Sequence, residues 1–109
     1  MRLRNIKNAY EKVAVNERYF IPNPNEIKGK WHEIFGNNNP VHIEIGMGKG
    51  RFIHTMAKEH PDINYVGIEK YSSVLLRAIQ KMEEEELPNL KFIRMDAEDI
   101  VKVFGKGEV

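Results

Sequence analysis

The sequence predicts an α/β fold in which a partial parallel sheet of about three strands is flanked by helices. One observation is the alternation of short β-branched runs with segments of helical periodicity from residue 41 to residue 104. Another is a glycine-rich turn at residues 44–50, which joins one such run to the next periodic segment. Strands that alternate with helices are joined by right-handed crossovers, so the strands lie parallel and helices cover both faces.

Length and composition are those of a soluble single-domain protein. The 109 residues suffice for one core, and 41% hydrophobic with 30% charged residues is ordinary for a globular domain. The absence of cysteine excludes a disulfide framework, a thiolate metal site and a cysteine nucleophile. No apolar run is long enough to span a bilayer, and no signal-peptide core follows the basic start. We therefore expect a cytoplasmic protein with no membrane partner.

The first 40 residues are predicted to form a basic arm and a helix. Residues 1–30 contain seven Lys or Arg against three Asp or Glu, whereas residues 31–109 contain ten against thirteen. Residues 1–24 show no sustained periodicity and end in a proline-containing run, which indicates an arm that is not part of the core. Asn25 then caps a helix that ends at Gly36. The arm either adds phosphate contacts to an enzyme or is a solvated tail.

Three strands and three helices are expected to follow in alternation. The strands are predicted at residues 41–45, 64–68 and 90–94, and the helices at residues 51–60, from Ser72 or Ser73 to the turn at 87–88, and at 97–104. Residues 108–109 resemble the approach to a further strand. Three strands are half of a doubly wound sheet, with the first strand at an open edge. We therefore expect that the chain is truncated and that this edge permits self-association.

The turn after the first strand has the chemistry of a small-ligand cradle. Gly46 and Gly48 allow tight turning and close approach to a ligand, and the following helix points its N-terminal amides at the same place. A dinucleotide site requires the spacing G-x-G-x-x-G, but Arg51 stands where the third glycine would be. Glu44, just before the turn, disfavours a pyrophosphate and suits a cationic amino group.

Two further carboxylates are expected beside this turn, because ligands of open α/β sheets bind outside the carboxyl ends of the strands. Glu69 ends the second strand, where an acidic side chain can accept hydrogen bonds from both hydroxyls of a ribose. Asp96 follows the third strand. Each carboxylate could instead be a loop residue or a helix cap, and Asp96 in particular could cap the helix that begins at Ala97.

Four segments together resemble the first half of bacterial tRNA (guanine-N7)-methyltransferases. They are Val-His-Ile-Glu-Ile-Gly-Met-Gly-Lys-Gly at residues 41–50, Asn-Tyr-Val-Gly-Ile-Glu at 64–69, Leu-Pro-Asn-Leu at 87–90 and Asp-Ala-Glu-Asp at 96–99. The glycine motif is common to many methyltransferases, whereas the combination is more specific. The resemblance covers roughly residues 41–109. It implies a Rossmann-like methyltransferase fold, with residues 41–109 forming the first half of an S-adenosylmethionine-binding domain.

By that resemblance, the contacts to S-adenosylmethionine match six residues of this chain: Glu44, Gly46, Gly48, Glu69, Asp96 and Ala97. The family methylates N7 of a guanosine in tRNA, so tRNA is the implied partner of the complete enzyme. The family's later Asp-Pro-Trp and Thr-Asp segments have no counterpart here, so we expect no catalytic residue in this chain. The ring nitrogen is itself the nucleophile, and alignment and electrostatics drive the transfer.

Other interpretations stay open at this level. The chain could belong to a methyltransferase that acts on a small molecule or a protein, or it could be a cofactor-binding module without activity. A nicotinamide-binding domain is disfavoured by the glycine spacing. The four histidines show no metal-ligand spacing, so no metal site is expected.

Overall fold

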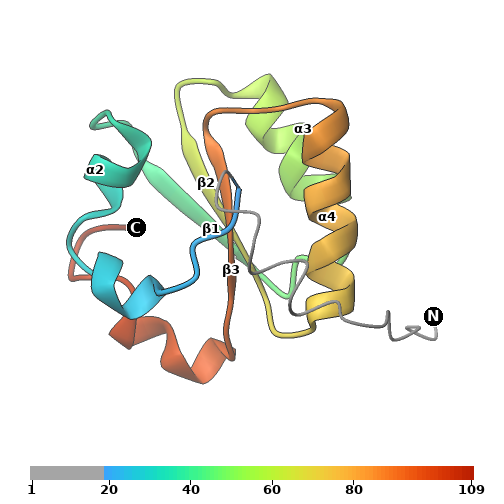
Figure 1. The fold of residues 1–109 in the computed structure, drawn as a ribbon. Coiled ribbons are helices and arrows are strands. Elements are labelled where there is room, and N and C mark those ends of the chain that lie inside the picture. Colours follow the sequence, from blue (N-terminus) through green and yellow to red (C-terminus); the bar gives the residue numbers. More distant parts are fainter. Residues whose placement is uncertain (1–18) are drawn as a thin grey trace.

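The computed structural model describes residues 19–109, and it confirms the predicted alternation of strands and helices (Figure 1). The basic part of the predicted arm, residues 1–18, lies outside the described residues. The elements follow in the order η1 (Pro24–Ile27), α2 (Trp31–Phe35), β1 (Val41–Ile45), α3 (Arg51–Glu59), β2 (Asn64–Glu69), α4 (Ser72–Glu84), β3 (Leu90–Arg94) and η2 (Ala97–Lys102), where η denotes a 3-10 helix.

The three strands form one parallel sheet in the order β1-β2-β3. The register pairs Ile45 with Ile68 and Glu69 with Arg94, so all three strands end at the same edge. This edge is where the sequence predicts a binding site. Within the described residues β1 pairs only with β2, as expected for a strand at the edge of the sheet.

Two hydrophobic clusters cover the two faces of the sheet. Helices α3 and α4 lie on one face, while α2 and the two 3-10 helices lie on the other (Figure 1). Successive side chains of β2 belong alternately to the two clusters. Tyr65 lies in the cluster with α3 and α4, and Val66 lies in the cluster with α2. Every residue of β2 is buried, as expected for a central parallel strand.

The prediction that residues 1–24 contribute nothing to the core is wrong for Tyr19 and Phe20. Both are buried, with 5% and 4% of their surface exposed, and both belong to the cluster under α3 and α4. The Phe92 amide donates to the Tyr19 carbonyl at 2.7 Å, and the Ile21 amide donates to the Phe92 carbonyl at 2.9 Å. This short parallel bridge covers the outer edge of β3. Two aromatic residues carry no periodicity, so the pattern could not reveal the pairing.

The single helix expected from Asn25 to Gly36 is two short helices. Gly29, at φ +80°, interrupts the backbone between η1 and α2. The left-handed Gly36 ends α2 as predicted. Trp31 is fully buried and its Nε1 donates to the Val103 carbonyl at 2.9 Å, which holds α2 on the sheet through the segment after η2.

Two smaller predictions also need correction. Tyr71, not Ser72 or Ser73, occupies the N-cap position of α4, and it makes no side-chain capping bond. The last helix is a 3-10 helix that ends at Lys102, so the expected extent to residue 104 is too long. Residues 108–109, described from the sequence as the approach to a further strand, form no strand themselves, and that expectation stays a prediction.

Glu108 instead binds three backbone amides. Its carboxylate accepts hydrogen bonds from Gly105 at 2.7 Å, Gly29 at 2.9 Å and Trp31 at 3.0 Å. Burial by itself raises the pKa of Glu108, but the three amide bonds outweigh it and hold the pKa below the ordinary value of 4.5. The ionised carboxylate thereby joins the interruption at Gly29 and the start of α2 to the end of the chain.

Asn89 joins α3 to the start of β3. It is buried, and its Nδ2 lies within hydrogen-bond distance of the carbonyls of Ala57 (2.9 Å), His60 (3.1 Å) and Ile63 (2.8 Å). These carbonyls belong to the last turn of α3 and to the connection between α3 and β2, where the backbone has no helical partners. One side-chain amide therefore shapes the connection that sets the start of β2.

Replacing Asn89 with alanine is expected to lower the free energy of unfolding by on the order of 1–3 kcal/mol, because buried carbonyls lose their donor. The measurement is urea unfolding followed by circular dichroism. Asn38→Ala, in the exposed loop before β1, is the matched control and is expected to stay within about 0.5 kcal/mol of the parent. Equal stability of the two variants would contradict the bridging role.

Glu108→Gln is expected to destabilise the protein at neutral pH but not in acid. A carboxylate with a depressed pKa contributes stability above its unfolded-state pKa, here about 4.5, and that contribution is lost as the pH falls through the folded-state value. The difference in unfolding free energy between parent and variant should therefore shrink below pH 4.5. Glu33→Gln removes an exposed carboxylate of α2 and serves as the control. A pH-independent difference would refute the role of the charge.

Candidate functional site

A cavity of about 360 Å³ lies at the carboxyl ends of the three strands. Its lining comes from the ends of β1, β2 and β3 and the residues just after them, namely Ile45, Gly46, Ile68, Glu69, Lys70, Tyr71, Met95, Asp96 and Ala97. The volume lies in the usual range for small-molecule sites, roughly 300–1,000 Å³. We call it the strand-end cavity. Four of the six predicted site residues, Gly46, Glu69, Asp96 and Ala97, meet there.

The glycine turn forms one wall of the cavity. Gly46 and Gly48 have φ values of +67° and +62°, which residues with a Cβ rarely adopt. The Gly46 and Met47 amides both donate to the Ile68 carbonyl, at 2.8 and 3.2 Å, so the turn folds back over the end of β2. Helix α3 begins directly after Gly50. The predicted strand, turn and helix are thus present in the predicted order.

Met47 packs between the glycine turn and the sheet. It is buried and packs in the cluster under α3 and α4. It occupies the space over Gly67, since a Cβ built on Gly67 would overlap the Met47 sulfur and lie 3.0 Å from Phe92 Cδ1. The missing side chain in the central strand therefore lets the turn lie close to the sheet.

Glu69 is the most constrained polar residue of the cavity. It is 8% exposed, and its carboxylate accepts hydrogen bonds from the amides of Gly48 (3.2 Å), Lys70 (3.0 Å) and Tyr71 (3.2 Å). A carboxylate has about four lone-pair positions, so about one remains for a ligand donor. A second donor would have to replace one of the long bonds. Glu69 thus connects the turn to the end of β2 and still faces the cavity.

Asp96 and Ala97 form the opposite wall. Asp96 caps η2, because its Oδ1 accepts a hydrogen bond from the Glu98 amide at 3.2 Å. The capping alternative considered for Asp96 is therefore correct, and the residue lines the cavity at the same time. Its side chain is exposed and retains a second oxygen, so capping does not prevent ligand contact.

Glu44 and Gly48 are not among the residues that line the cavity. Glu44 lies in β1 opposite Gly67, one position before the last residue of the strand, and is half-buried. Burial raises the pKa of its carboxyl above the ordinary value. Gly48 contributes indirectly, through its amide bond to Glu69. Both predicted contacts remain predictions.

Five lining residues were not singled out from the sequence: Ile45, Ile68, Lys70, Tyr71 and Met95. Each lies within two residues of the end of a strand, so position relative to the strand ends could have identified them. Tyr71 leaves 52% of its surface exposed, and the Lys70 ammonium lies 5.1 Å from its ring centroid. The apolar side chains and the tyrosine ring offer flat surfaces to a heterocycle, while Glu69 offers acceptors to hydroxyl groups.

Residues 19–109 contain neither a metal-binding cluster nor a membrane-spanning helix. No cluster of three or more His, Cys, Asp or Glu side chains in this part of the chain could hold a metal ion. No helix there is long and apolar enough to cross a membrane.

Comparison with curated proteins finds close relatives along the whole chain. It is 62% identical over 109 residues to a tRNA (guanine-N(7)-)-methyltransferase of Lachnoclostridium phytofermentans. Enzymes of the same name from Geobacillus sp. (strain WCH70) and Bacillus cytotoxicus are 55% and 51% identical. Each match covers 100% of this chain and 50% of the relative. The chain therefore spans about half the length of the curated relatives that it matches.

Solved structures confirm the predicted Rossmann-like methyltransferase fold. A protein described as an antibiotic related methyltransferase matches with a TM-score of 0.56 and 30% identity, over 64% of this chain and 37% of that one. The antibiotic-resistance methyltransferase Kmr shares the fold, with a TM-score of 0.52 and 22% identity over 62% of this chain and 34% of that one.

The family model described as putative methyltransferase matches residues 38–109, which include the glycine turn and all three strands. That match, the relatives and the sheet topology agree, and the chain belongs to this methyltransferase family.

Proposed function

We propose that this chain is the S-adenosylmethionine-binding half of a methyltransferase that forms 7-methylguanosine in tRNA. Membership of the family implies a methyl donor. The observation that carries the choice of donor is the strand-end cavity, where a glycine turn, a buried carboxylate and flat apolar surfaces meet. The relatives named as tRNA (guanine-N(7)-)-methyltransferases support the choice of substrate.

The proposed placement of the cofactor follows the chemistry of the lining. Glu69 accepts hydrogen bonds from the ribose hydroxyls, one at its remaining lone pair and the other in place of the 3.2 Å bond from Tyr71. Asp96 and Ala97 flank the adenine, with Asp96 able to accept from its exocyclic amine. Glu44 and the turn at Gly46 and Gly48 face the methionine end, where a carboxylate suits a cationic amino group.

S-adenosylmethionine supplies an electrophilic methyl group when bound, and guanine N7 is already a nucleophile. The chain therefore needs no covalent nucleophile, and its residues bind and orient the donor. We assign substrate recognition and the catalytic groups to the remainder of the protein, because the relatives are about twice as long as this chain.

The organisation and environment of the protein complete the proposal. Residues 41–109 form the first half of the cofactor domain, and residues 1–40 precede it as a basic arm with short helices. A tRNA-modifying enzyme works in the cytoplasm, in agreement with the location expected from the sequence. The open side of β1 is a surface through which copies of this isolated chain can associate.

Glu69→Ala is expected to weaken S-adenosylhomocysteine binding by on the order of 1.5–3 kcal/mol, because the ribose loses an ionised hydrogen-bond acceptor. Calorimetric titration of the 109-residue chain measures this, with NADH as a control ligand. Glu84→Ala, at the exposed end of α4, is the matched control and should leave affinity unchanged. Unchanged affinity in a folded Glu69→Ala variant would remove the ribose assignment.

A tRNA transcript with 7-deazaguanosine in place of guanosine is expected to accept no methyl group, since it lacks the N7 nucleophile. The assay is transfer of radiolabelled methyl from S-adenosylmethionine, using a protein extended to the length of its relatives. The 109-residue chain alone should bind the cofactor product without turnover. Methylation of the 7-deaza transcript would rule out N7 as the acceptor, and methylation of small molecules or proteins instead of tRNA would redirect the substrate assignment.

A further inference from the structure

A second cavity, of about 550 Å³, lies beside the strand-end cavity, and Asp96 alone of its lining residues is among the proposed cofactor contacts. We call it the outer cavity. Its lining consists of Pro22, Asn23, Pro24, Asn25, Glu26, Arg94, Met95, Asp96, Asp99 and Lys102. Met95 and Asp96 line both cavities, so the two adjoin at the end of β3. A molecule in the outer cavity would therefore lie next to the adenine end of a cofactor in the other.

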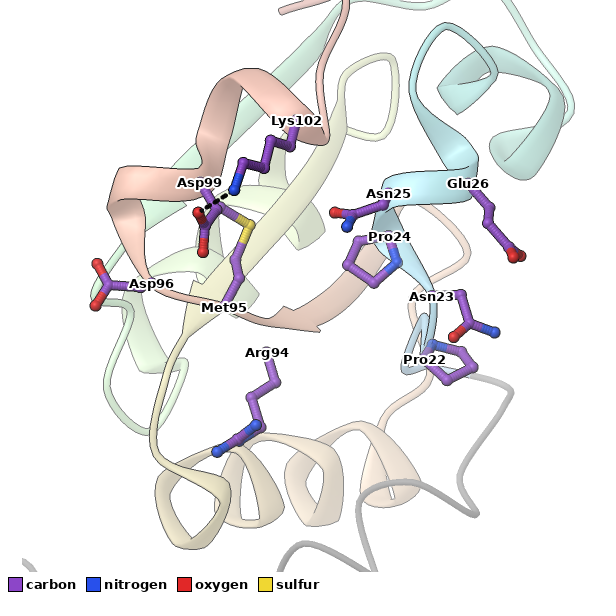
Figure 2. A pocket seen from close by; sticks show the side chains of 10 residues that line it. All are labelled: Pro22, Asn23, Pro24, Asn25, Glu26, Arg94, Met95, Asp96, Asp99 and Lys102. Carbon is purple, nitrogen blue, oxygen red and sulfur yellow. Dashed lines mark ion pairs between the residues drawn. The ribbon is translucent and has the colours of Figure 1, made fainter.

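The outer cavity is built from two segments that are far apart in the sequence. Figure 2 shows residues 22–26 on one side, the residues from Met95 to Lys102 on the other, and Arg94 below both groups, with its guanidinium directed toward α4. The amide of Asn25 extends toward Asp99 and Lys102, which form an ion pair at 3.2 Å, while the carboxylate of Glu26 turns away (Figure 2). The bridge from Tyr19 and Ile21 to Phe92 fixes the first segment beside β3.

The side chains that face the cavity are chemically mixed, which restricts the ligand. Arg94 and Lys102 supply positive charge, and Asp96 and Asp99 supply negative charge. A guanidinium binds phosphate, whereas carboxylates accept hydrogen bonds from the exocyclic amines of nucleobases. The Asn25 amide can both donate and accept, as the edge of a base requires. A nucleotide has all of these complementary groups in one molecule, whereas a bare phosphate or an apolar ligand would leave part of the lining unmatched.

The sequence next to the cavity favours RNA as the source of that nucleotide. Residues 19–21 join residues 22–26 to residues 1–18, which contain five Lys or Arg against two Asp or Glu. Basic side chains bind nucleic acids through backbone phosphates, independently of sequence. Single-stranded RNA also presents unpaired bases whose edges are free to enter a pocket.

We propose that the outer cavity binds one unpaired nucleotide of the RNA substrate, with its phosphate on Arg94 and its base against Asn25 and Asp99. The inference rests on the proposed function, because it takes RNA to be the substrate. It adds a specific RNA contact to the half of the protein that holds the cofactor. Bases that carry an exocyclic amine, such as guanine and cytosine, are expected to bind better than uracil, which offers the carboxylates no amine.

The test titrates the 109-residue chain, first saturated with S-adenosylhomocysteine, with GMP, CMP and UMP, and follows backbone amide resonances by NMR. Arg94→Met and Asn25→Ala are expected to weaken GMP and CMP binding by roughly ten-fold while S-adenosylhomocysteine affinity is unchanged. Both residues are exposed, so the variants should fold. Arg77→Met on the outer side of α4 and Asn38→Ala in the loop before β1 are the matched controls, and neither should alter any affinity.

A single-stranded RNA trinucleotide, GpGpG, distinguishes RNA from a free nucleotide as the natural source. It should bind more tightly than GMP and lose affinity in the same two variants. GMP binding without any gain for the trinucleotide would overturn the assignment to RNA. If the nucleotides displaced S-adenosylhomocysteine, or bound all variants equally, the outer cavity would not be their binding site. Cofactor binding without nucleotide binding would overturn this inference alone, whereas failure to bind S-adenosylhomocysteine would overturn both proposals.

Discussion

The hydrogen bond between the Glu69 carboxylate and the Gly48 amide is the contact on which the arrangement of the site depends. It joins the end of the central strand to a turn that belongs to its neighbour, and the amides of Lys70 and Tyr71 hold the second oxygen of the same carboxylate. A backbone turn of glycines has no side chains with which to fix itself. The structure supplies that rigidity from outside, through Glu69 above the turn and buried Met47 beneath it.

Much of the fold and part of the site were predictable, because the signals that define them are local and periodic. Three β-branched runs predicted three parallel strands, and their carboxyl ends brought Gly46, Glu69, Asp96 and Ala97 to one cavity. The absence of Glu44 from the lining was not predictable in the same way. Whether a side chain near a strand end faces a cavity depends on the path of the following turn. The sequence pattern does not specify that path, because the turn contains three glycines at positive φ.

The errors at the N-terminal end share one physical cause. Tyr19 and Phe20 are held by pairing with β3, and α2 is held by the Trp31 bond to Val103 and the amide bonds to Glu108. All of these partners lie more than 70 residues further along the chain. Helical periodicity describes neighbours, so it could neither find these contacts nor show that the backbone breaks at Gly29. Long-range hydrogen bonds, and not propensity, determine the structure of this region.

The bridge between Phe20 and Phe92 also has a consequence for how the protein acquires its structure during synthesis. Residue 20 leaves the ribosome well before residue 92, and it cannot pair until β3 has been made. The sheet is then completed by joining two segments that are about 70 residues apart, a step whose entropic cost rises with the length of the intervening loop. Contacts of this kind slow folding. The edge of the sheet that carries the strand-end cavity, formed by sequential strands, can therefore be in place before the N-terminal segment docks beside it.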